Sequence, residues 1–126
     1  MAMFIKNPID MSSTFDTCLN KGDIEALMGL LAPNAVSRTP QGDVLTDQEA
    51  IRENLAGMIA AGATLHNTPR HVLVSGDAAL LLIDWTLTFA PAVGVPAASG
   101  TTTNVVVRDA ASGSWQLAIL NPMGTA

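Results

Sequence analysis

The segment of residues 19–36 places the strongest constraint on what this chain can fold into. An apolar-periodic stretch stops at Gly22, Asp23 opens a second apolar stripe, and Pro33 closes it. Glycine favours the left-handed backbone that ends a helix, and an aspartate accepts hydrogen bonds from the first free N–H groups of the next helix. The segment therefore predicts two consecutive helices followed by a short strand over residues 35–38.

The rest of the chain predicts one more helix and then a sheet. The first helix is expected over residues 8–20, and Thr46 with Glu49 forms a capping box for a third helix that closes at Gly62. The strands expected after it cover residues 63–74, 78–89, 101–108 and 114–121, with a loop over 90–100. Helices first and strands afterwards indicate an α+β fold, with three N-terminal helices packed on a curved mixed or antiparallel sheet.

Composition narrows the class of protein. At 126 residues we expect one domain, 1–126, and only 13% of the residues are charged. The six basic residues are scattered and the net charge is −5, so nucleic-acid binding is not expected. We find no apolar run of the roughly 18 residues that a membrane span needs, and the one cysteine, Cys18, can form no internal disulfide. These features predict a cytoplasmic protein that hides surface in a pocket or an oligomer interface.

Three motifs carry a resemblance to a known family. They are the segment 19–36, Gly113-Ser114-Trp115-Gln116-Leu117, and the closing Asn121-Pro122-Met123-Gly124. Together they resemble an uncharacterised subgroup of the SnoaL-like, ketosteroid-isomerase-like branch of the nuclear-transport-factor-2 superfamily. That resemblance implies a cystatin-like α+β cone with an internal pocket. It leaves the chemistry open, because the superfamily includes isomerases, cyclases, dehydratases, transport factors and binding domains.

The strand expected over residues 78–89 has two possible registers. One face carries Leu80, Leu82, Asp84, Thr86 and Thr88, and the other carries Leu81, Ile83, Trp85, Leu87 and Phe89. The resemblance implies that the first set falls where the steroid-isomerase-like relatives line their pocket, so we favour the register that turns Asp84 and Thr86 into the pocket and leaves the Trp85 face outward. A carboxylate in an apolar cavity can exchange a proton near neutral pH, so Asp84 is the candidate catalytic residue. The alternative register buries the Trp85 face and places Asp84 in solvent.

The resemblance also assigns positions that differ from the steroid isomerases. Their oxyanion tyrosine on the first helix falls at Phe15, and their aspartate base falls at Thr39, whose hydroxyl is no useful base. Their oxyanion aspartate falls at or beside Asn104, whose amide can donate a hydrogen bond. Steroid isomerisation by the known set of residues is therefore rejected unless Asp84 replaces the base.

Further polar residues complete the predicted site. Arg38 ends the first strand and could bind a carboxylate or enolate ligand or pair with Asp84, and Asn121 ends the last strand, where it could cap the pocket or form a turn. His66 and His71 are five residues apart, which on a regular strand places them on opposite faces, so no metal site is predicted. A bulge near Pro69 would change that register. One of Arg70 and His71 is expected to point inward.

The sequence favours a small-molecule-binding domain with a mostly apolar pocket, no cofactor, and a small apolar or carbonyl-containing ligand. Phe15, Arg38, Thr86, Asn104 and Asn121 are the predicted ligand-binding residues. The alternative is an isomerase, cyclase or dehydratase acting on a carbonyl compound, with Asp84 as acid and base. A wholly apolar outer sheet face needs a cover, so a homodimer through that face is also predicted.

Overall fold

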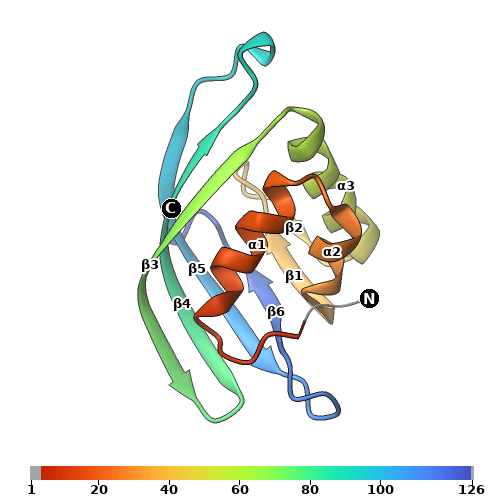
Figure 1. Cartoon of the computed structure of the whole chain (residues 1–126), viewed down its shortest axis with the longest axis vertical. Coiled ribbons are helices and arrows are strands. Elements are labelled where there is room, and N and C mark those ends of the chain that lie inside the picture. The colour runs from red at the N-terminus through yellow and green to blue at the C-terminus, as the bar shows by residue number, and fades with distance from the viewer. Residues whose placement is uncertain (1–3, 126) are drawn as a thin grey trace.

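The computed structural model describes residues 4–125, and within them three α-helices cover one side of a curved six-stranded sheet (Figure 1). The elements in chain order are α1 (Asp10–Asn20), α2 (Ile24–Gly29), β1 (Leu31–Arg38), β2 (Val44–Leu45), α3 (Gln48–Ala60), β3 (Thr64–Ser75), β4 (Ala78–Thr88), the 3₁₀ turn η1 (Pro91–Val93), β5 (Ala98–Arg108) and β6 (Trp115–Leu120). The predicted α+β class is confirmed. Within these residues no helix is long and apolar enough to cross a bilayer.

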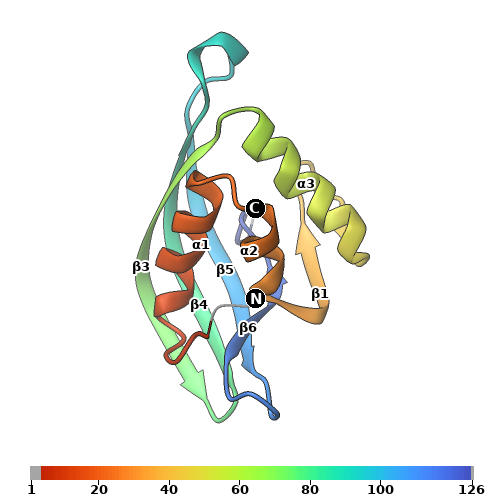
Figure 2. The same cartoon turned by 45° about the vertical axis from the view of Figure 1, so that its right-hand side comes forward.

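The sheet is mixed, and its strand order places the first strand of the chain beside the last. The order is β2-β1-β6-β5-β4-β3, with β1 and β6 parallel and all other neighbours antiparallel. The view in Figure 2 shows the long strands β3, β4 and β5 curving behind α1, while α3 lies over the end of the sheet that contains β1. The helices therefore lie on the concave side of the sheet.

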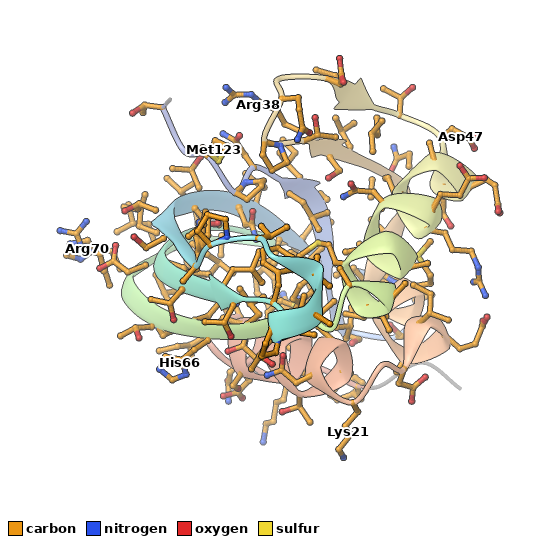
Figure 3. All side chains as sticks on the ribbon, turned by 90° about the horizontal axis from the view of Figure 1, so that it is seen from above. Lys21, Arg38, Asp47, His66, Arg70 and Met123 are labelled. Carbon is orange, nitrogen blue, oxygen red and sulfur yellow. The ribbon has the colours of Figure 1, made fainter. Side chains whose placement is uncertain are left out.

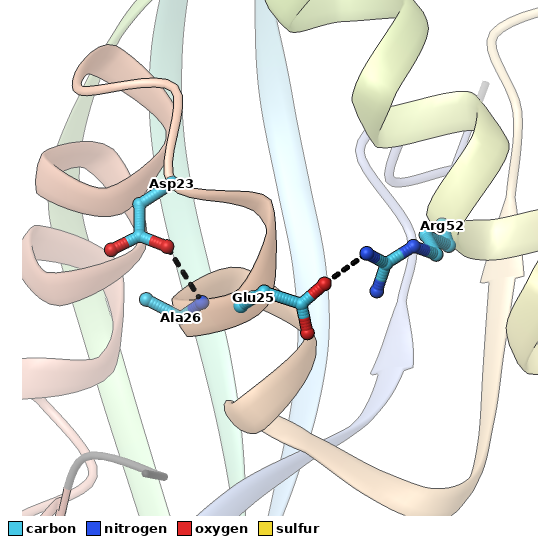
Figure 4. A network of polar contacts seen from close by, with 4 residues as sticks. All are labelled: Asp23, Glu25, Ala26 and Arg52. Carbon is cyan, nitrogen blue, oxygen red and sulfur yellow. Dashed lines mark hydrogen bonds and ion pairs between the residues drawn. The ribbon is translucent and has the colours of Figure 1, made fainter.

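The helix entry follows the local signals in the sequence. Gly22 has a φ of 73°, the left-handed conformation that ends α1, and the Asp23 carboxylate accepts a hydrogen bond of 3.1 Å from the Ala26 N–H. Figure 4 shows that cap beside an ion pair between Glu25 of α2 and Arg52 of α3. Arg52 lowers the pKa of the Glu25 carboxyl. The Glu25 side chain is solvent-exposed, so the pair contributes little to the stability of the fold.

The first strand begins earlier than predicted. Helix α2 ends at Gly29, and β1 already starts at Leu31 because the Leu30 carbonyl accepts a 2.8 Å hydrogen bond from Leu117 of β6. Pro33 therefore lies inside the strand and does not end the helix. The pairing of β1 with β6 is irregular between Leu31 and Val36, which accommodates a residue that has no N–H to donate.

The predicted capping box of α3 is wrong by one residue. Asp47 is the N-cap, and its carboxylate accepts from the Glu49 N–H at 3.2 Å. Thr46 precedes the cap. Because Asp and Thr are both good N-cap residues, two adjacent candidates could not be separated by spacing alone.

Strand β4 adopts the register that was not favoured. Ala79, Leu81 and Ile83 are buried, and Trp85 and Leu87 pack against the same core. The face with Leu80, Leu82, Asp84, Thr86 and Thr88 is therefore the outer face, which corrects the prediction. The reason is hydrophobic continuity: the inner set is apolar along its whole length, whereas the outer set becomes polar from Asp84 onward.

Helix α1 is fastened to β3, which is the edge strand of the sheet. Asn20 donates from Nδ2 to the Leu65 carbonyl at 2.9 Å and accepts from the Leu65 N–H at 2.8 Å. One turn earlier, Asp16 accepts from the Asn67 N–H at 2.8 Å and from Asn67 Nδ2 at 2.6 Å. These side chains complete the hydrogen bonding of backbone groups that an edge strand leaves without a neighbouring strand.

The ring of Trp85 is held across the inner face of β5. This strand starts at Ala98, inside the predicted loop, and Gly100 pairs directly with Trp85. A Cβ atom on Gly100 would lie 2.8 Å from Cζ2 of that ring, and the indole N–H donates to the Pro122 carbonyl at 2.7 Å. Gly100 is therefore required by close packing of the ring.

We expect Gly100→Ala to lower the free energy of unfolding by about 1–3 kcal/mol, because the methyl group displaces an indole that its hydrogen bond holds in place. Gly57→Ala is the matched control, since nothing lies within 4 Å of a Cβ there. That change in the interior of α3 should raise stability by about 0.5–1 kcal/mol. Urea unfolding of both variants measures the two effects, and equal stabilities would contradict the packing argument.

Candidate functional site

A cavity of about 130 Å³ lies between the helices and the concave face of the sheet, and it opens to solvent on one side. Its wall is mostly apolar. The apolar lining residues come from α1, α3, β3, β4, β6 and the segments that follow β1 and β6. They are Met11, Phe15, Pro40, Leu55, Met58, Leu65, Leu81, Ile83, Trp85, Leu87, Leu117, Leu120 and Pro122. The Trp85 face of β4 thus forms the floor of the cavity.

The polar part of the wall is almost entirely neutral. The polar lining residues are Ser12, Ser37, Arg38, Asn54, Asn67, Thr102 and Asn104. Arg38 is the one ionisable side chain among the lining residues that the structure describes. Such a wall can orient a ligand through hydrogen bonds, and it offers no carboxylate, imidazole or thiol for proton transfer.

Three of the predicted ligand-binding residues, Phe15, Arg38 and Asn104, line the cavity. Asn121 is not a lining residue, but it joins two of them. Arg38 Nη1 donates to Asn121 Oδ1 at 3.2 Å, and the Asn121 N–H donates to Asn104 Oδ1 at 2.8 Å. The structure therefore brings Arg38, Asn104 and Asn121 into one polar cluster. Their roles in ligand binding stay predictions.

The contact with Asn121 also fixes the orientation of the Asn104 amide. A backbone N–H can only donate, so Oδ1 of Asn104 faces Asn121 and Nδ2 faces the other way. Within residues 4–125, no group accepts a hydrogen bond from this Nδ2. Asn104 therefore has a free donor at the cavity wall.

Asp84 and Thr86 lie outside the cavity, so their predicted placement is wrong. Asp84 is on the outer face, where it accepts from Thr101 Oγ1 at 2.9 Å and pairs with Arg70 Nε at 3.5 Å. Its side chain is 50% exposed. An exposed carboxylate on the far side of the sheet cannot act on a ligand in the cavity, and Thr86 is exposed on the same face.

The two histidines lie on the same face of β3, contrary to the regular-strand prediction. His66 pairs with Thr86 and His71 pairs with Leu82, because a bulge between Pro69 and His71 adds one residue to β3. Neither Arg70 nor His71 points inward. Figure 3 shows Arg70 projecting away from the helices, and among the described residues no three His, Cys, Asp or Glu side chains form a group that could hold a metal.

The structure adds one pair that sequence reasoning missed, Asp16 with Asn67. Asn67 lines the cavity, and its amide is held by the Asp16 carboxylate. Because a carboxylate oxygen accepts hydrogen bonds, Nδ2 of Asn67 faces Asp16 and Oδ1 of Asn67 faces the other way. Among the described residues, no group donates a hydrogen bond to this Oδ1. The available signal was the spacing of Asp16 and Asn20, two polar residues one turn apart on the sheet side of α1.

Burial raises the pKa of the Asp16 carboxyl, and the hydrogen bonds from Asn67 and the positive field of His66 offset that effect only in part. A raised pKa means that the folded state binds the proton more tightly than the unfolded state does. Asp16 therefore contributes stability at acid pH that is lost as the pH rises from 3.8 through the pKa of the folded state.

We expect Asp16→Asn to remove this dependence. As the pH rises between about 4 and 7, the wild type should lose stability relative to the variant, since only the wild type must ionise a half-buried group. Thermal unfolding of both proteins across that range measures the difference. If the stability of the wild type increases relative to that of the variant as the pH rises, the hydrogen bonds to the carboxylate outweigh the effect of its burial on the pKa.

The fold and the cavity define a class: a small α+β cone whose helices and curved sheet enclose a pocket. The model of the SnoaL-like domain family matches residues 13–112, so the chain belongs to the SnoaL-like domain family. No curated protein matches the chain in sequence.

Solved structures share the fold at low identity. A domain from Thiobacillus denitrificans ATCC 25259, named after the calcium/calmodulin-dependent protein kinase type II association domain, is 16% identical with a TM-score of 0.80, over 98% of this chain and 99% of that one. An NTF-2 like protein of unknown function from Shewanella oneidensis MR-1 is 14% identical, with a TM-score of 0.73 over 89% and 92%. A ketosteroid isomerase-like protein from Erwinia carotovora atroseptica SCRI1043 is 19% identical, with a TM-score of 0.69 over 89% and 88%. These likenesses establish the fold alone.

Proposed function

We propose that this chain binds a small, largely apolar molecule in the cavity between the helices and the sheet. The observation that supports it is the lining: apolar side chains interrupted by a few polar groups, nearly all of them neutral. An apolar, partly enclosed pocket with a few polar groups is the usual form of a small-molecule site. An engineered apolar cavity of about 150 Å³ accommodates benzene, so a cavity of about 130 Å³ holds about one ring, and a second ring would extend to its open side.

Binding is favoured over acid–base catalysis by the same lining. The isomerase, cyclase or dehydratase alternative needs a group that takes up and returns a proton at the ligand. Asp84, the residue predicted for that role, is paired with Arg70 on the outer face. Arg38, the one ionisable residue among the described lining residues, is a permanent cation and cannot take up a proton.

We expect tetralin, an apolar bicyclic hydrocarbon, to raise the melting temperature of the wild type, because a ligand that binds only the folded state stabilises it. Met58→Trp should abolish that increase, since Met58 lines the cavity and the indole would fill it. Glu53→Trp places the same ring on the exposed side of the same helix and should preserve the increase. Thermal-shift titration measures all three proteins, and no response in the wild type would contradict the proposal.

We also propose that the outer sheet face pairs with a second copy of the chain. An apolar groove on this face is lined by Leu73, Ser75, Ala78, Ala79, Leu80 and Val105. Leu73 is 57% exposed there, and Ile119 on the outer side of β6 is 42% exposed. A two-fold axis would let this apolar surface cover itself, which is the usual arrangement of homodimers.

Sedimentation velocity tests the pairing. Leu73→Lys should shift the wild-type dimer toward monomer, because a charge would be buried in the interface. Val74→Lys is the matched control: the neighbouring residue is 56% exposed and points to the opposite face, so its substitution should leave the dimer intact. A wild type that sediments as a monomer at tens of micromolar, or equal effects of both variants, would contradict pairing through this face.

A further inference from the structure

The two asparagines of the cavity wall present opposite hydrogen-bonding atoms. We propose that Asn67 offers an acceptor and Asn104 a donor, so that the ligand is an apolar, uncharged compound with a hydroxyl at one end and a carbonyl at the other. This inference rests on the proposed function, since it names the chemistry of the ligand in the same cavity.

The acceptor follows from the contacts of Asn67. Asp16 takes the Asn67 amide nitrogen at 2.6 Å and the backbone N–H of the same residue at 2.8 Å. Two hydrogen bonds to one carboxylate leave the amide a single favourable orientation, with Oδ1 directed away from α1. A ligand group that meets this oxygen must donate, and a hydroxyl is the neutral group of that kind that an apolar pocket accommodates at the smallest desolvation cost.

The donor follows in the same way from Asn104. Its Oδ1 accepts from the Asn121 N–H at 2.8 Å, which leaves Nδ2 for the ligand. Because Nδ2 can only donate, the complementary ligand group is an acceptor such as a ketone oxygen. Neither asparagine carries charge, and Arg38, the one ionisable residue among the described lining residues, already donates to Asn121.

The register of the sheet sets the distance between the two groups. Asn67 pairs with Trp85 and Asn104 pairs with Leu81, so the asparagines lie on either side of β4 and four residues apart along it. On a flat sheet their Cα atoms would be roughly 16 Å apart. A hydroxyl and a carbonyl about 7 Å apart, with two hydrogen bonds of about 2.9 Å, span about 13 Å, which suits side chains that converge over a concave face. A bicyclic hydroxyketone has this spacing.

Asp16 is the positioning residue in this arrangement. It does not line the cavity, yet it decides which end of the Asn67 amide does. With an asparagine at position 16, the Asn67 amide could rotate and accept from the new amide nitrogen instead. The cavity would then present N–H where it now presents Oδ1, and the preference for a hydroxyl would be lost.

The test uses four probes with the same bicyclic skeleton. Tetralin has no polar group, tetralone has the carbonyl, tetrahydronaphthol has the hydroxyl, and hydroxytetralone has both, with its hydroxyl para to the aromatic carbon that bears the carbonyl. Titration calorimetry at neutral pH should give the wild type a Kd for hydroxytetralone about fivefold below that for tetralone and about fivefold below that for tetrahydronaphthol. Asn67→Leu should abolish the preference for hydroxytetralone over tetralone, which reports the hydroxyl, and should keep the preference over tetrahydronaphthol, which reports the carbonyl. Asn104→Asp should abolish the preference over tetrahydronaphthol and keep the preference over tetralone, because a carboxylate still accepts from the Asn121 N–H but cannot donate to the ligand carbonyl.

Asp16→Asn should remove the preference for hydroxytetralone over tetralone although no lining residue is changed. Asn20→Ala is its control, since it loosens the same helix from the same strand one turn away and does not touch the Asn67 amide. That control should lower the melting temperature and preserve the ratio, which separates positioning from a merely structural role.

The outcomes distinguish the two proposals. If tetralin binds and hydroxytetralone binds no tighter, the cavity is a ligand site and the donor–acceptor assignment is overturned. If the ratios survive Asn67→Leu and Asn104→Asp, the polarity comes from other groups and the assignment is again overturned. If none of the four probes binds, the proposed function fails and this inference fails with it.

Discussion

The hydrogen bonds between helix α1 and the edge strand β3 are the interaction on which the cavity depends. Asn20 pairs with both backbone groups of Leu65, and Asp16 holds the backbone and side chain of Asn67. Without them, peptide groups covered by the helix would lack partners, at about 1–3 kcal/mol each. Because the bonds come from two successive turns, they fix both the height and the rotation of α1 above the sheet. The cavity wall formed by Phe15 therefore has one defined position.

The orientation of β4 separates the molecule into two surfaces with different tasks. Its inner side is apolar from Ala79 to Leu87 and provides both the core and the cavity floor. Its outer side carries an apolar end around Leu80 and a polar end, where Asp84 pairs with Arg70. The hydrophobic effect decides between the faces, since the longer apolar stripe removes more surface from water. The acidic residue is thereby placed away from the cavity.

Sequence reasoning was most successful for the helix boundary at residues 22–23 and least successful for contacts between residues far apart in the chain. Gly22 and Asp23 act within one turn of themselves, so the helix boundary they form was predictable. The inner face of β4 is apolar throughout, so the alternation in the sequence itself favoured the observed register, and the prediction was wrong because the family resemblance was given more weight than that pattern. The bond between Asp16 and Asn67 joins residues 51 positions apart, and the spacing of Asp16 and Asn20 indicates only which side of α1 faces the sheet. The α+β fold was therefore predicted well, and the site only in part.

The polarity of the cavity is a consequence of the fold and not a separate design. Each of the two asparagines uses one end of its amide to complete a structural hydrogen bond, Asn67 toward α1 and Asn104 toward the end of β6. An amide has one donor end and one acceptor end, so the end that is consumed determines the end that remains. Neutral groups can fill this role inside an apolar wall because their desolvation costs far less than that of a charge.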